Sequence, residues 1–497
     1  MKLSRILEEI ELTGGLPESD PGITAVVCDS RKVLPGALFV AVRGEKADGH
    51  DYLAQAAAAG AAALMVEDPS VDTQGLPTVS VHDSEAALGR AASAFFGHPS
   101  RSLTLVGITG TNGKTTTTHL VQHILNSAGV TCGRIGTVGI SYPTGEETAT
   151  LTTPDAPAFH AALARMLTEG AAAVVAEVSS HALLRKRVEG CSFACTVFTN
   201  LSQDHLDYHG TMEEYFAAKR LLFTDHPRLV EAVVNADDPW GRRLAPDLGG
   251  HVVTFGVHQG DIRVEILETD ASGTMAIARY PEGSTRFRLP LVGEFNASNA
   301  AAALATAWAL GLDPAKAARA LENAPQTPGR LQFIPNDQGI AAFVDYAHTP
   351  DALDRVLETL RRITEGRLMV LFGCGGDRDR GKRPLMAAAA ARWADVVVTT
   401  ADNSRSESTS SILDAIDAGF PAEWKAPLPG EPVTSGTRLR IEDRLGAIRW
   451  LVGEARRGDT IILAGKGHET TQTIGDKVRK FDDRRELRLL LDGRRVA

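Results

Sequence analysis

Short apolar runs recur along most of this chain, and many of them end in polar or glycine-rich residues. One such run, residues 103–108, leads through a glycine-rich turn into residues 115–127, whose apolar positions have the spacing of one helix face. A continuous apolar run followed by a helical pattern is typical of a buried strand in a parallel sheet. The pattern therefore predicts an α/β protein.

The predicted strands form three groups along the chain. The first group surrounds a short alanine-rich helix at residues 52–59, and its strands span residues 23–28, 37–42 and 62–66. The strands of the middle group span residues 103–108, 172–176, 195–199, 232–235 and 252–255. Those of the last group span residues 341–344, 368–372, 396–399 and 460–463. Strands that alternate with helices predict doubly wound parallel sheets, whose ligands bind beyond the carboxyl ends of the strands.

Two breaks in composition separate these groups. Glycine, proline and polar residues cluster at residues 97–101 and again at residues 324–330, and such clusters interrupt regular structure. We expect three domains, which span residues 1–100, 101–328 and 329–497. They are a small N-terminal α/β domain, a central doubly wound domain of the phosphate-loop type and a C-terminal Rossmann-like α/β domain.

Composition and charge narrow the class of protein. The formal net charge of −10 over 497 residues argues against non-specific binding of nucleic acid. No stretch approaches the roughly 20 apolar residues that span a bilayer, and the first residues show no signal-peptide pattern. The five cysteines form no C-x-x-C pair, which favours reduced thiols. We therefore expect a cytoplasmic protein without membrane insertion.

The turn after residues 103–108 carries the clearest candidate chemistry. Backbone N–H groups, a helix N-terminus and Lys114 would surround one point there, where a triphosphate fits. Thr115 would offer its hydroxyl to Mg²⁺. The glycines differ from the usual phosphate-loop pattern, because Ile108 stands where the first glycine is expected. The predicted ATP-binding residues of this turn are Gly110, Thr111, Asn112, Gly113, Lys114, Thr115 and Thr116.

Two further segments of the middle group could bind metal or phosphate. Glu177 follows the strand at 172–176 and could complete a Mg²⁺ site with Thr115, although a helix-capping cluster is the alternative. Residues 200–210 contain His205 and His209, which would share a face in a helix. Two histidines make an incomplete zinc site, so a role with Mg²⁺ and phosphate is favoured over zinc or a plain surface loop.

Three other residues have ordinary interpretations from their spacing alone. Lys219 lies in a helical pattern, where a lysine is normally a solvated surface group. Asn299 belongs to a short polar segment before an alanine-rich helix and could act as a cap. Arg330 follows the second break and could be a linker charge.

The last group of strands leads into four polar loops, several of them rich in glycine. The loops span residues 345–348, 373–378, 402–405 and 465–469. Because the carboxyl ends of parallel strands meet at one edge of a sheet, the loops would converge on a second polar site.

These motifs resemble a known family. Residues 109–115 are similar to the nucleotide loop of the Mur ligases and of folylpolyglutamate synthetase, which are ATP-dependent amide-forming enzymes. The resemblance extends over the whole chain through residues 29–41, 49–50, 152–155, 177–183, 200–210, 345–350, 373–383 and 465–469. Together these stretches resemble the Mur ligase that adds the third residue of the peptidoglycan stem peptide.

The resemblance implies roles for residues that spacing leaves unassigned. Ser30 would contact the UDP group in the N-terminal domain, and Thr152, Thr153, Ser179 and Arg187 would hold the muramyl dipeptide. Lys219 would be N-carbamylated and would bridge Mg²⁺ together with Thr115, Glu177 and His205. The resemblance makes Lys114, Lys219, His205 and Glu177 the catalytic set, and it adds Asn299, Arg330, Asp345 and His348 to the nucleotide site.

The C-terminal loops would select meso-2,6-diaminopimelate. The matching residues are Arg378, Asp402, Asn403, Arg405, Gly465 and Glu469. A guanidinium can bind the second carboxylate of diaminopimelate bidentately, whereas L-lysine offers no such group. The chain departs from the family at Ser404, where proline is usual, and at Arg185, where glutamine is frequent.

The implied activity is ATP-dependent ligation through an acyl phosphate. The substrates would be ATP, UDP-MurNAc-L-Ala-D-Glu and meso-diaminopimelate, with Mg²⁺ as cofactor and a monomer as the expected state. The alternatives are the same reaction with L-lysine, folate polyglutamylation on the same fold, and a nucleotide-binding module that ligates nothing.

Overall fold

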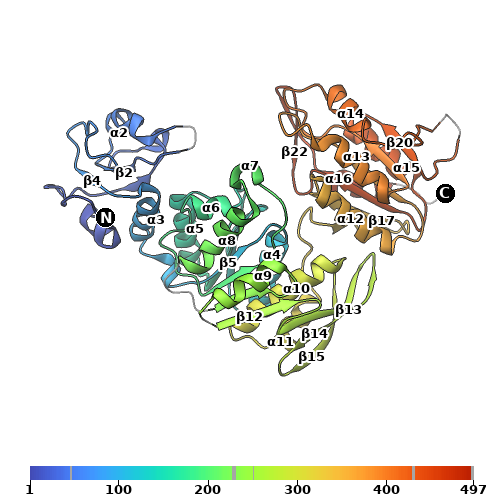
Figure 1. Ribbon diagram of the computed structural model, residues 1–497, viewed down its shortest axis with the longest axis horizontal. Coiled ribbons are helices and arrows are strands. Elements are labelled where there is room, and N and C mark those ends of the chain that lie inside the picture. Colours follow the sequence, from blue (N-terminus) through green and yellow to red (C-terminus); the bar gives the residue numbers. More distant parts are fainter. Residues whose placement is uncertain (45–46, 226–230, 250, 428–430, 494–497) are drawn as a thin grey trace. The chain divides into compact units, whose positions relative to one another are not determined.

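The computed structural model describes residues 1–44, 47–225, 231–249, 251–427 and 431–493 (Figure 1). The chain forms two compact units. One comprises Met1–Val264, Ala278–Thr285 and Ser298–Ala320, and the other comprises Glu265–Ile277, Arg286–Ala297 and Leu321–Ala497. Among the described residues no helix is both long enough and apolar enough to cross a membrane.

The first part of the chain contains a small parallel sheet. Its strands lie in the order β1 (Ala25–Val27), β2 (Ala37–Val40), β3 (Ala63–Val66) and β4 (Thr78–Ser80). The helices α1 (Leu3–Ile6), α2 (Leu53–Ala58) and α3 (Ser84–Phe95) accompany it. Apolar clusters fill both faces, because the strand residues alternate between them. The predicted strands of the first group are confirmed.

The central sheet has the order β15-β14-β13-β12-β11-β10-β5-β9-β6-β7-β8. Its strands from β12 to β6 run parallel, and β12 also pairs in parallel with β13. They are β5 (Thr104–Thr109), β6 (Cys132–Gly136), β9 (Ala173–Glu177), β10 (Cys195–Phe198), β11 (Glu231–Asn235) and β12 (His251–Gly256). The other strands are β7 (Gly139–Tyr142), β8 (Gly145–Glu147), β13 (Ile262–Asp270), β14 (Gly273–Tyr280) and β15 (Gly283–Leu289). The predicted parallel strands are confirmed to within a residue or two.

Most helices of this region connect strands of the central sheet, and the last two follow β15. The helices are α4 (Lys114–Ser127), α5 (Ala156–Thr168), α6 (Ser180–Leu184), α7 (Leu206–His209), α8 (Met212–Thr224), α9 (Pro239–Leu244), α10 (Glu294–Ala309) and α11 (Pro314–Leu321). Helix α10 begins before Asn299. The interpretation of Asn299 as a cap is therefore wrong.

The C-terminal region forms a six-stranded sheet in the order β16-β17-β21-β18-β19-β20, with only β16 antiparallel. The strands are β16 (Gln332–Phe333), β17 (Ala341–Asp345), β18 (Leu368–Phe372), β19 (Val396–Thr399), β20 (Thr437–Arg440) and β21 (Thr460–Ala464). The helices are α12 (Pro350–Ile363), α13 (Lys382–Trp393), α14 (Thr409–Asp417), α15 (Arg444–Glu454) and α16 (Asp483–Gly493). A hairpin of β22 (Thr471–Ile474) and β23 (Lys477–Lys480) follows β21.

All five cysteines are free, and only Cys28 is partly exposed. Burial raises the pKa of the Cys28 thiol to about 11 and that of Cys132 to about 12. The thiols therefore stay protonated at neutral pH, as the expectation of buried reduced cysteines requires.

Candidate active site

The glycine-rich turn between β5 and α4 is shaped by close contacts that exclude side chains. Gly110 has φ +148° and Gly113 has φ +85°. A Cβ atom on Gly110 would collide with the Thr199 hydroxyl, and one on Gly113 would collide with the Asn299 carboxamide oxygen. The turn therefore packs too closely against Thr199 and Asn299 to admit side chains at these two positions, and Asn299 lies beside it in α10.

The segment after β10 holds this turn in place. The Thr199 hydroxyl donates to the Asn112 carbonyl at 2.6 Å, and the Asn200 side chain donates to the same carbonyl at 3.1 Å. In return the Asn112 N–H donates to Asn200 Oδ1 at 3.0 Å. These bonds order the loop without any ligand, as a phosphate site requires.

Two lysines meet at one carbonyl of the turn. Lys114 Nζ donates to the carbonyls of Gly110 at 2.7 Å and Thr111 at 2.9 Å, while Lys219 Nζ donates to the Gly110 carbonyl at 2.9 Å. Lys219 is only 1% exposed, and its Nζ lies 4.4 Å from the centre of the Tyr215 ring. The expectation of a solvated surface lysine is therefore wrong, because α8 turns Lys219 inward beneath the phosphate loop.

The surroundings of Lys219 disfavour its charged form. Burial lowers the pKa of this amine well below its usual 10.5, the nearby Lys114 lowers it further, and Asp204 opposes the shift. Among the described residues no carboxylate lies within ion-pair distance of Lys219. A neutral lysine amine is a nucleophile, so this position is suited to covalent modification.

Glu177 lies at the end of β9 and is fully buried. Its carboxylate accepts hydrogen bonds from the Thr115 hydroxyl at 3.0 Å, the Thr137 N–H at 2.9 Å and the Thr137 hydroxyl at 3.0 Å. The cap of α6 is Ser179, whose Oγ accepts from the Ala182 N–H at 3.2 Å. The metal-site and helix-cap interpretations of this segment thus apply to different residues. Glu177 faces the phosphate loop, whereas Ser179 caps α6.

Three histidines from the segments after β9 and β10 gather together. The His181 ring lies 5.1 Å from the His205 ring and 5.4 Å from the His209 ring. His205 is half-exposed and its Nε2 lies 3.5 Å from Asp204. His209 is buried, and its Nε2 lies 2.9 Å from the Ser180 hydroxyl. Burial lowers the pKa of His209 to about 4, and the charge of the nearby His181 contributes to this shift. No signal in the sequence singled out His181, although its ring lies close to the rings of both His205 and His209.

No preformed metal cluster exists in the described part of the chain, where His, Cys, Asp and Glu nowhere gather in threes with ligand geometry. Thr115 and Glu177 nevertheless place a hydroxyl and a carboxylate side by side next to the phosphate loop. Oxygen donors of this kind suit Mg²⁺, which keeps several of its ligands from water and phosphate. The residues present therefore fit Mg²⁺ better than zinc.

The four residues expected to hold a dipeptide lie together. The Thr153 hydroxyl donates to the Glu177 carbonyl at 2.8 Å and accepts from the Ser179 N–H at 3.1 Å. Arg187 donates to the Thr153 carbonyl at 3.0 Å, and Thr152 Oγ1 lies 3.1 Å from Thr137 Oγ1. The cluster adjoins the residues beside the phosphate loop through Glu177 and Thr137.

The segment that contains Ser30 contacts the segment that contains Thr152 and Thr153. Its hydroxyl donates to Gln55 Oε1 at 3.0 Å, and Lys32 forms an ion pair with Asp155 at 3.8 Å. Arg185 pairs with Glu85 at 2.7 Å, which gives this departure from the family pattern a structural role between α3 and α6.

The predicted nucleotide residues of the C-terminal region also gather. Buried Asp345 accepts from the N–H groups of Leu331 at 2.5 Å and Ala347 at 2.7 Å, and burial raises its pKa while Arg330 opposes that shift. The Arg330 guanidinium lies 4.9 Å from the Tyr346 ring centre. Its buried Nε finds no hydrogen-bond partner within the described residues, so a ligand could use it. His348 Nδ1 lies 2.8 Å from the Tyr346 carbonyl.

Two arginines flank Gly375 in the same region. A Cβ atom on Gly375 would lie 3.1 Å from Arg405 Nη1 and 3.7 Å from Arg378 Cγ. Arg405 has φ +50°, and its guanidinium donates to the Gly376 carbonyl at 2.7 Å. Its backbone pairs with the hairpin, because the Gly475 N–H donates to the Arg405 carbonyl at 2.8 Å. The side chains of two arginines thus lie beside the same glycine.

The remaining predicted residues of this site form a polar network. Asn403 Nδ2 donates to Glu469 Oε2 at 2.8 Å, and the Asn403 N–H donates to Asp402 Oδ1 at 2.6 Å. A Cβ on Gly465, which has φ +106°, would lie 2.8 Å from Asp402 Oδ2. Lys466 joins the network through Glu469, and the sequence offered no signal for it beyond its place between two glycines.

Ser404 is buried, and its hydroxyl lies 2.6 Å from the hydroxyl of Thr409, the first residue of α14. A Cβ atom on Gly376 would collide with the Ser404 carbonyl. Hydrogen bonding and close packing therefore restrain the residue before Arg405, where the family usually has a proline ring.

Comparison with known proteins identifies the family of this chain. Residues 22–96 match the family model for "Mur ligase family, catalytic domain", residues 108–307 match "Mur ligase middle domain" and residues 329–467 match "Mur ligase, glutamate ligase domain". The UDP-N-acetylmuramoyl-L-alanyl-D-glutamate--2,6-diaminopimelate ligase of Geobacter metallireducens is 43% identical over 98% of this chain and 96% of its own. The chain belongs to the Mur ligase family. The Geobacillus thermodenitrificans protein of the same name is also 43% identical, over the whole of both chains.

Solved structures support the three-domain architecture of this Mur ligase. A structure named as the same diaminopimelate ligase aligns with a TM-score of 0.71 at 33% identity, over 99% of this chain and 98% of that one. MurF from Acinetobacter baumannii aligns with a TM-score of 0.63 at 20% identity, over 93% of this chain and 95% of that one, and shares the fold. The folylpolyglutamate synthase of Mycobacterium tuberculosis, complexed with ADP and AMPPCP, has a TM-score of 0.60 at 19% identity over 76% of this chain and 91% of that one.

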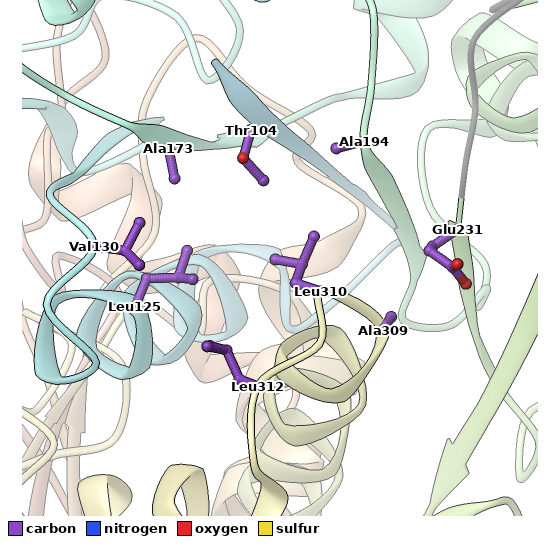
Figure 2. A pocket seen from close by; sticks show the side chains of 9 residues that line it. All are labelled: Thr104, Leu125, Val130, Ala173, Ala194, Glu231, Ala309, Leu310 and Leu312. Atoms are coloured by element: carbon purple, nitrogen blue, oxygen red, sulfur yellow. The ribbon is translucent and has the colours of Figure 1, made fainter. Parts of the chain in front are cut away.

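The central sheet of this Mur ligase also carries a cavity of about 300 Å³ away from these clusters (Figure 2). Its lining includes Thr104 and Ala173, the first residues of β5 and β9, and Leu125 near the end of α4. The phosphate loop follows the opposite end of β5. The cavity is therefore distinct from the candidate active site.

Proposed function

We propose that this protein joins 2,6-diaminopimelate to UDP-N-acetylmuramoyl-L-alanyl-D-glutamate and converts ATP to ADP and phosphate. Full-length identity of 43% to relatives that bear this name supports the substrate assignment. The observation that carries it is the pair of arginines, Arg378 and Arg405, whose side chains both lie beside Gly375. Diaminopimelate has a carboxylate at each end, and the pair supplies the cations that its second carboxylate needs.

The reaction would proceed in two balanced steps. A carboxylate oxygen of the UDP substrate attacks the γ-phosphorus of ATP, and the bond to ADP breaks as the acyl phosphate forms. The amine nitrogen of diaminopimelate then attacks the acyl carbon, phosphate leaves, and the nitrogen loses a proton. Lys114 and the N–H groups of the turn would stabilise negative charge on the transferring phosphoryl group.

Mg²⁺ would be held by Thr115, Glu177 and His205 together with a modified Lys219. When bound, it would neutralise charge on the phosphate oxygens. The adjacency of the Thr115 hydroxyl and the Glu177 carboxylate at 3.0 Å supports this set.

The surroundings of Lys219 support its proposed carbamylation. Its neutral amine would attack the carbon of CO₂, form an N–C bond and lose a proton, which leaves a carboxylate on the side chain. The lowered pKa favours the reactive neutral form, and the nearby Lys114 cation would stabilise the new anion. One modification would thus remove an unfavourable amine and create a metal ligand.

The other assignments follow the same reading. Residues 1–100 would bind the UDP group through Ser30, residues 101–328 would bind ATP and the dipeptide, and residues 329–497 would bind the amino acid. Asn299, Arg330, Asp345 and His348 would contact the nucleotide. We further propose a monomer that acts in the cytoplasm on small molecules.

The decisive experiment measures ADP release by the pure protein with Mg²⁺, ATP and UDP-N-acetylmuramoyl-L-alanyl-D-glutamate. Meso-diaminopimelate and L-lysine are offered separately. The proposal predicts turnover with diaminopimelate and at least 100-fold lower kcat/KM with lysine, because the two arginines then lack a partner. Equal turnover with lysine would overturn the selectivity, and no turnover with either would indicate a module that binds nucleotide without ligation.

A further inference from the structure

Lys466 is a fully buried charged group beside the proposed amino-acid site. It follows β21 in the loop of residues 465–469, and its side chain is 0% exposed. Its ammonium donates to Glu469 Oε2 at 2.9 Å and lies 3.5 Å from Asn403 Oδ1. Both partners are proposed contacts of diaminopimelate, whereas nothing above assigns a role to Lys466 itself.

A second buried cation nearby shows what is unusual about Lys466. Arg444 pairs with Asp483 through two hydrogen bonds, and both side chains are 0% exposed. Lys466 has no such internal partner, because its one ion pair within the described structure is with Glu469, whose side chain is 32% exposed. A buried ammonium requires an anion, so it holds the Glu469 carboxylate against the loop.

The hydrogen bonds divide the two oxygens of Glu469 between the protein and the site. Oε2 accepts from both Lys466 and Asn403 Nδ2, at 2.9 Å and 2.8 Å. Across the described residues, no hydrogen bond reaches Oε1. Asn403 is itself fixed, since its Oδ1 accepts from the Thr473 N–H at 2.9 Å. The outer oxygen of a partly exposed carboxylate is thereby left to accept from a ligand.

We propose that Lys466 is a positioning residue for the incoming amino acid, which orients Glu469 and Asn403 so that Glu469 Oε1 accepts a hydrogen bond from an ammonium group of the substrate. This inference rests on the proposed function, because it names how the same site binds its amino acid. Lys466 touches neither ATP nor the UDP substrate in this account. Loss of the Lys466 side chain should therefore change the KM for diaminopimelate and leave the KM values for ATP and the UDP substrate unchanged.

The test compares three KM values in Lys466→Met, Glu469→Gln and the double variant. Lys466→Met removes the ammonium at similar volume and should raise the KM for diaminopimelate roughly 10- to 100-fold, the usual effect of a lost hydrogen bond to a charged group. The KM values for ATP and the UDP substrate should stay within about 2-fold. In the Glu469→Gln background the same change should add less than about 3-fold, because the residue it positions is already altered.

Two more variants secure the interpretation. Lys477→Met, at an exposed position of β23, is the matched control and should leave all three KM values unchanged. Lys466→Gln keeps a donor without the charge, so it decides the question if Lys466→Met does not fold. An unchanged KM for diaminopimelate in the uncharged variant, an equal rise in all three KM values, or additive effects in the double variant would overturn the proposal. Inactivity of the wild-type protein with diaminopimelate would instead overturn the proposed function.

Discussion

Two buried lysines, one in the central region and one in the C-terminal region, have opposite surroundings. Lys219 meets a backbone carbonyl and lies near a second lysine, and its pKa is lowered well below the usual value. Lys466 meets a carboxylate and a carboxamide oxygen. Burial is nearly complete for both. The comparison shows that the neighbours decide the chemistry: the first lysine is suited to become a neutral nucleophile, and the second to hold a carboxylate in place.

The largest effect is expected at the first lysine. Lys219→Ala removes the proposed metal-bridging carbamate and should lower kcat by about 100- to 1,000-fold, the usual range for a lost electrostatic contact to a transition state. ATP binding should change little, because Lys114 and the turn remain. Steady-state kinetics with added acetate should show partial recovery, since the small carboxylate replaces the carbamate. Lys316→Ala, at an exposed position of α11, is the control, and wild-type turnover in Lys219→Ala would contradict the bridging role.

The next largest effect is expected when the guanidinium of Arg405 in the C-terminal region is replaced. Arg405→Lys keeps the charge but loses the planar two-donor geometry, so kcat/KM for diaminopimelate should fall about 10- to 30-fold. The weaker rate with L-lysine should hardly change, because lysine lacks the second carboxylate. Parallel assays with both amino acids measure this ratio. An equal loss with both would mean that Arg405 supports the loop rather than the carboxylate.

Stability should respond to the two lysines with opposite signs. The lowered pKa of Lys219 means that, at pH values between its folded pKa and its unfolded pKa near 10.5, the unfolded chain holds a proton that the folded chain lacks. This penalty is complete below the folded pKa and fades as pH rises through the window between the two values. Lys219→Met should therefore raise the unfolding midpoint at pH 7 by about 2–4 °C in bicarbonate-free buffer.

Lys466→Met should lower the same midpoint by a similar amount, because it leaves the Glu469 carboxylate without its cation. Thermal unfolding of both variants at pH 7 and pH 10 makes the comparison, and the gain from Lys219→Met should shrink at the higher pH. Shifts of the same sign for the two variants would contradict the contrast between the lysines.

The smallest effect concerns the residue before Arg405. Thr409→Val removes the hydroxyl that pairs with Ser404, and the KM for diaminopimelate should rise about 2- to 5-fold. Adding Ser404→Pro should restore much of the loss, because the proline ring fixes φ by itself. Thr409→Ser keeps the hydroxyl and is the control. A Thr409→Val variant with unchanged KM would show that packing against Gly376 suffices.

The sequence predicted the parallel sheets and the loops that follow their strands, because continuous apolar runs mark strands buried on both faces. It did not predict the parallel strands β4, β6 and β20. It also did not predict β13, β14 and β15, in which buried and more exposed residues are interspersed. Whether a given side chain is buried was harder still to predict from the sequence. Nothing in the spacing around Lys219 separates an inward lysine from a solvated one, and only the fold brings it to the Gly110 carbonyl.

The most direct test of the contrast is ¹³C NMR of the protein equilibrated with ¹³C-bicarbonate near neutral pH. The account predicts a protein carbamate resonance that persists in Lys466→Met and is absent from Lys219→Ala. A carbamate signal that survives in Lys219→Ala, or the absence of any such signal from the active wild-type enzyme, would contradict it.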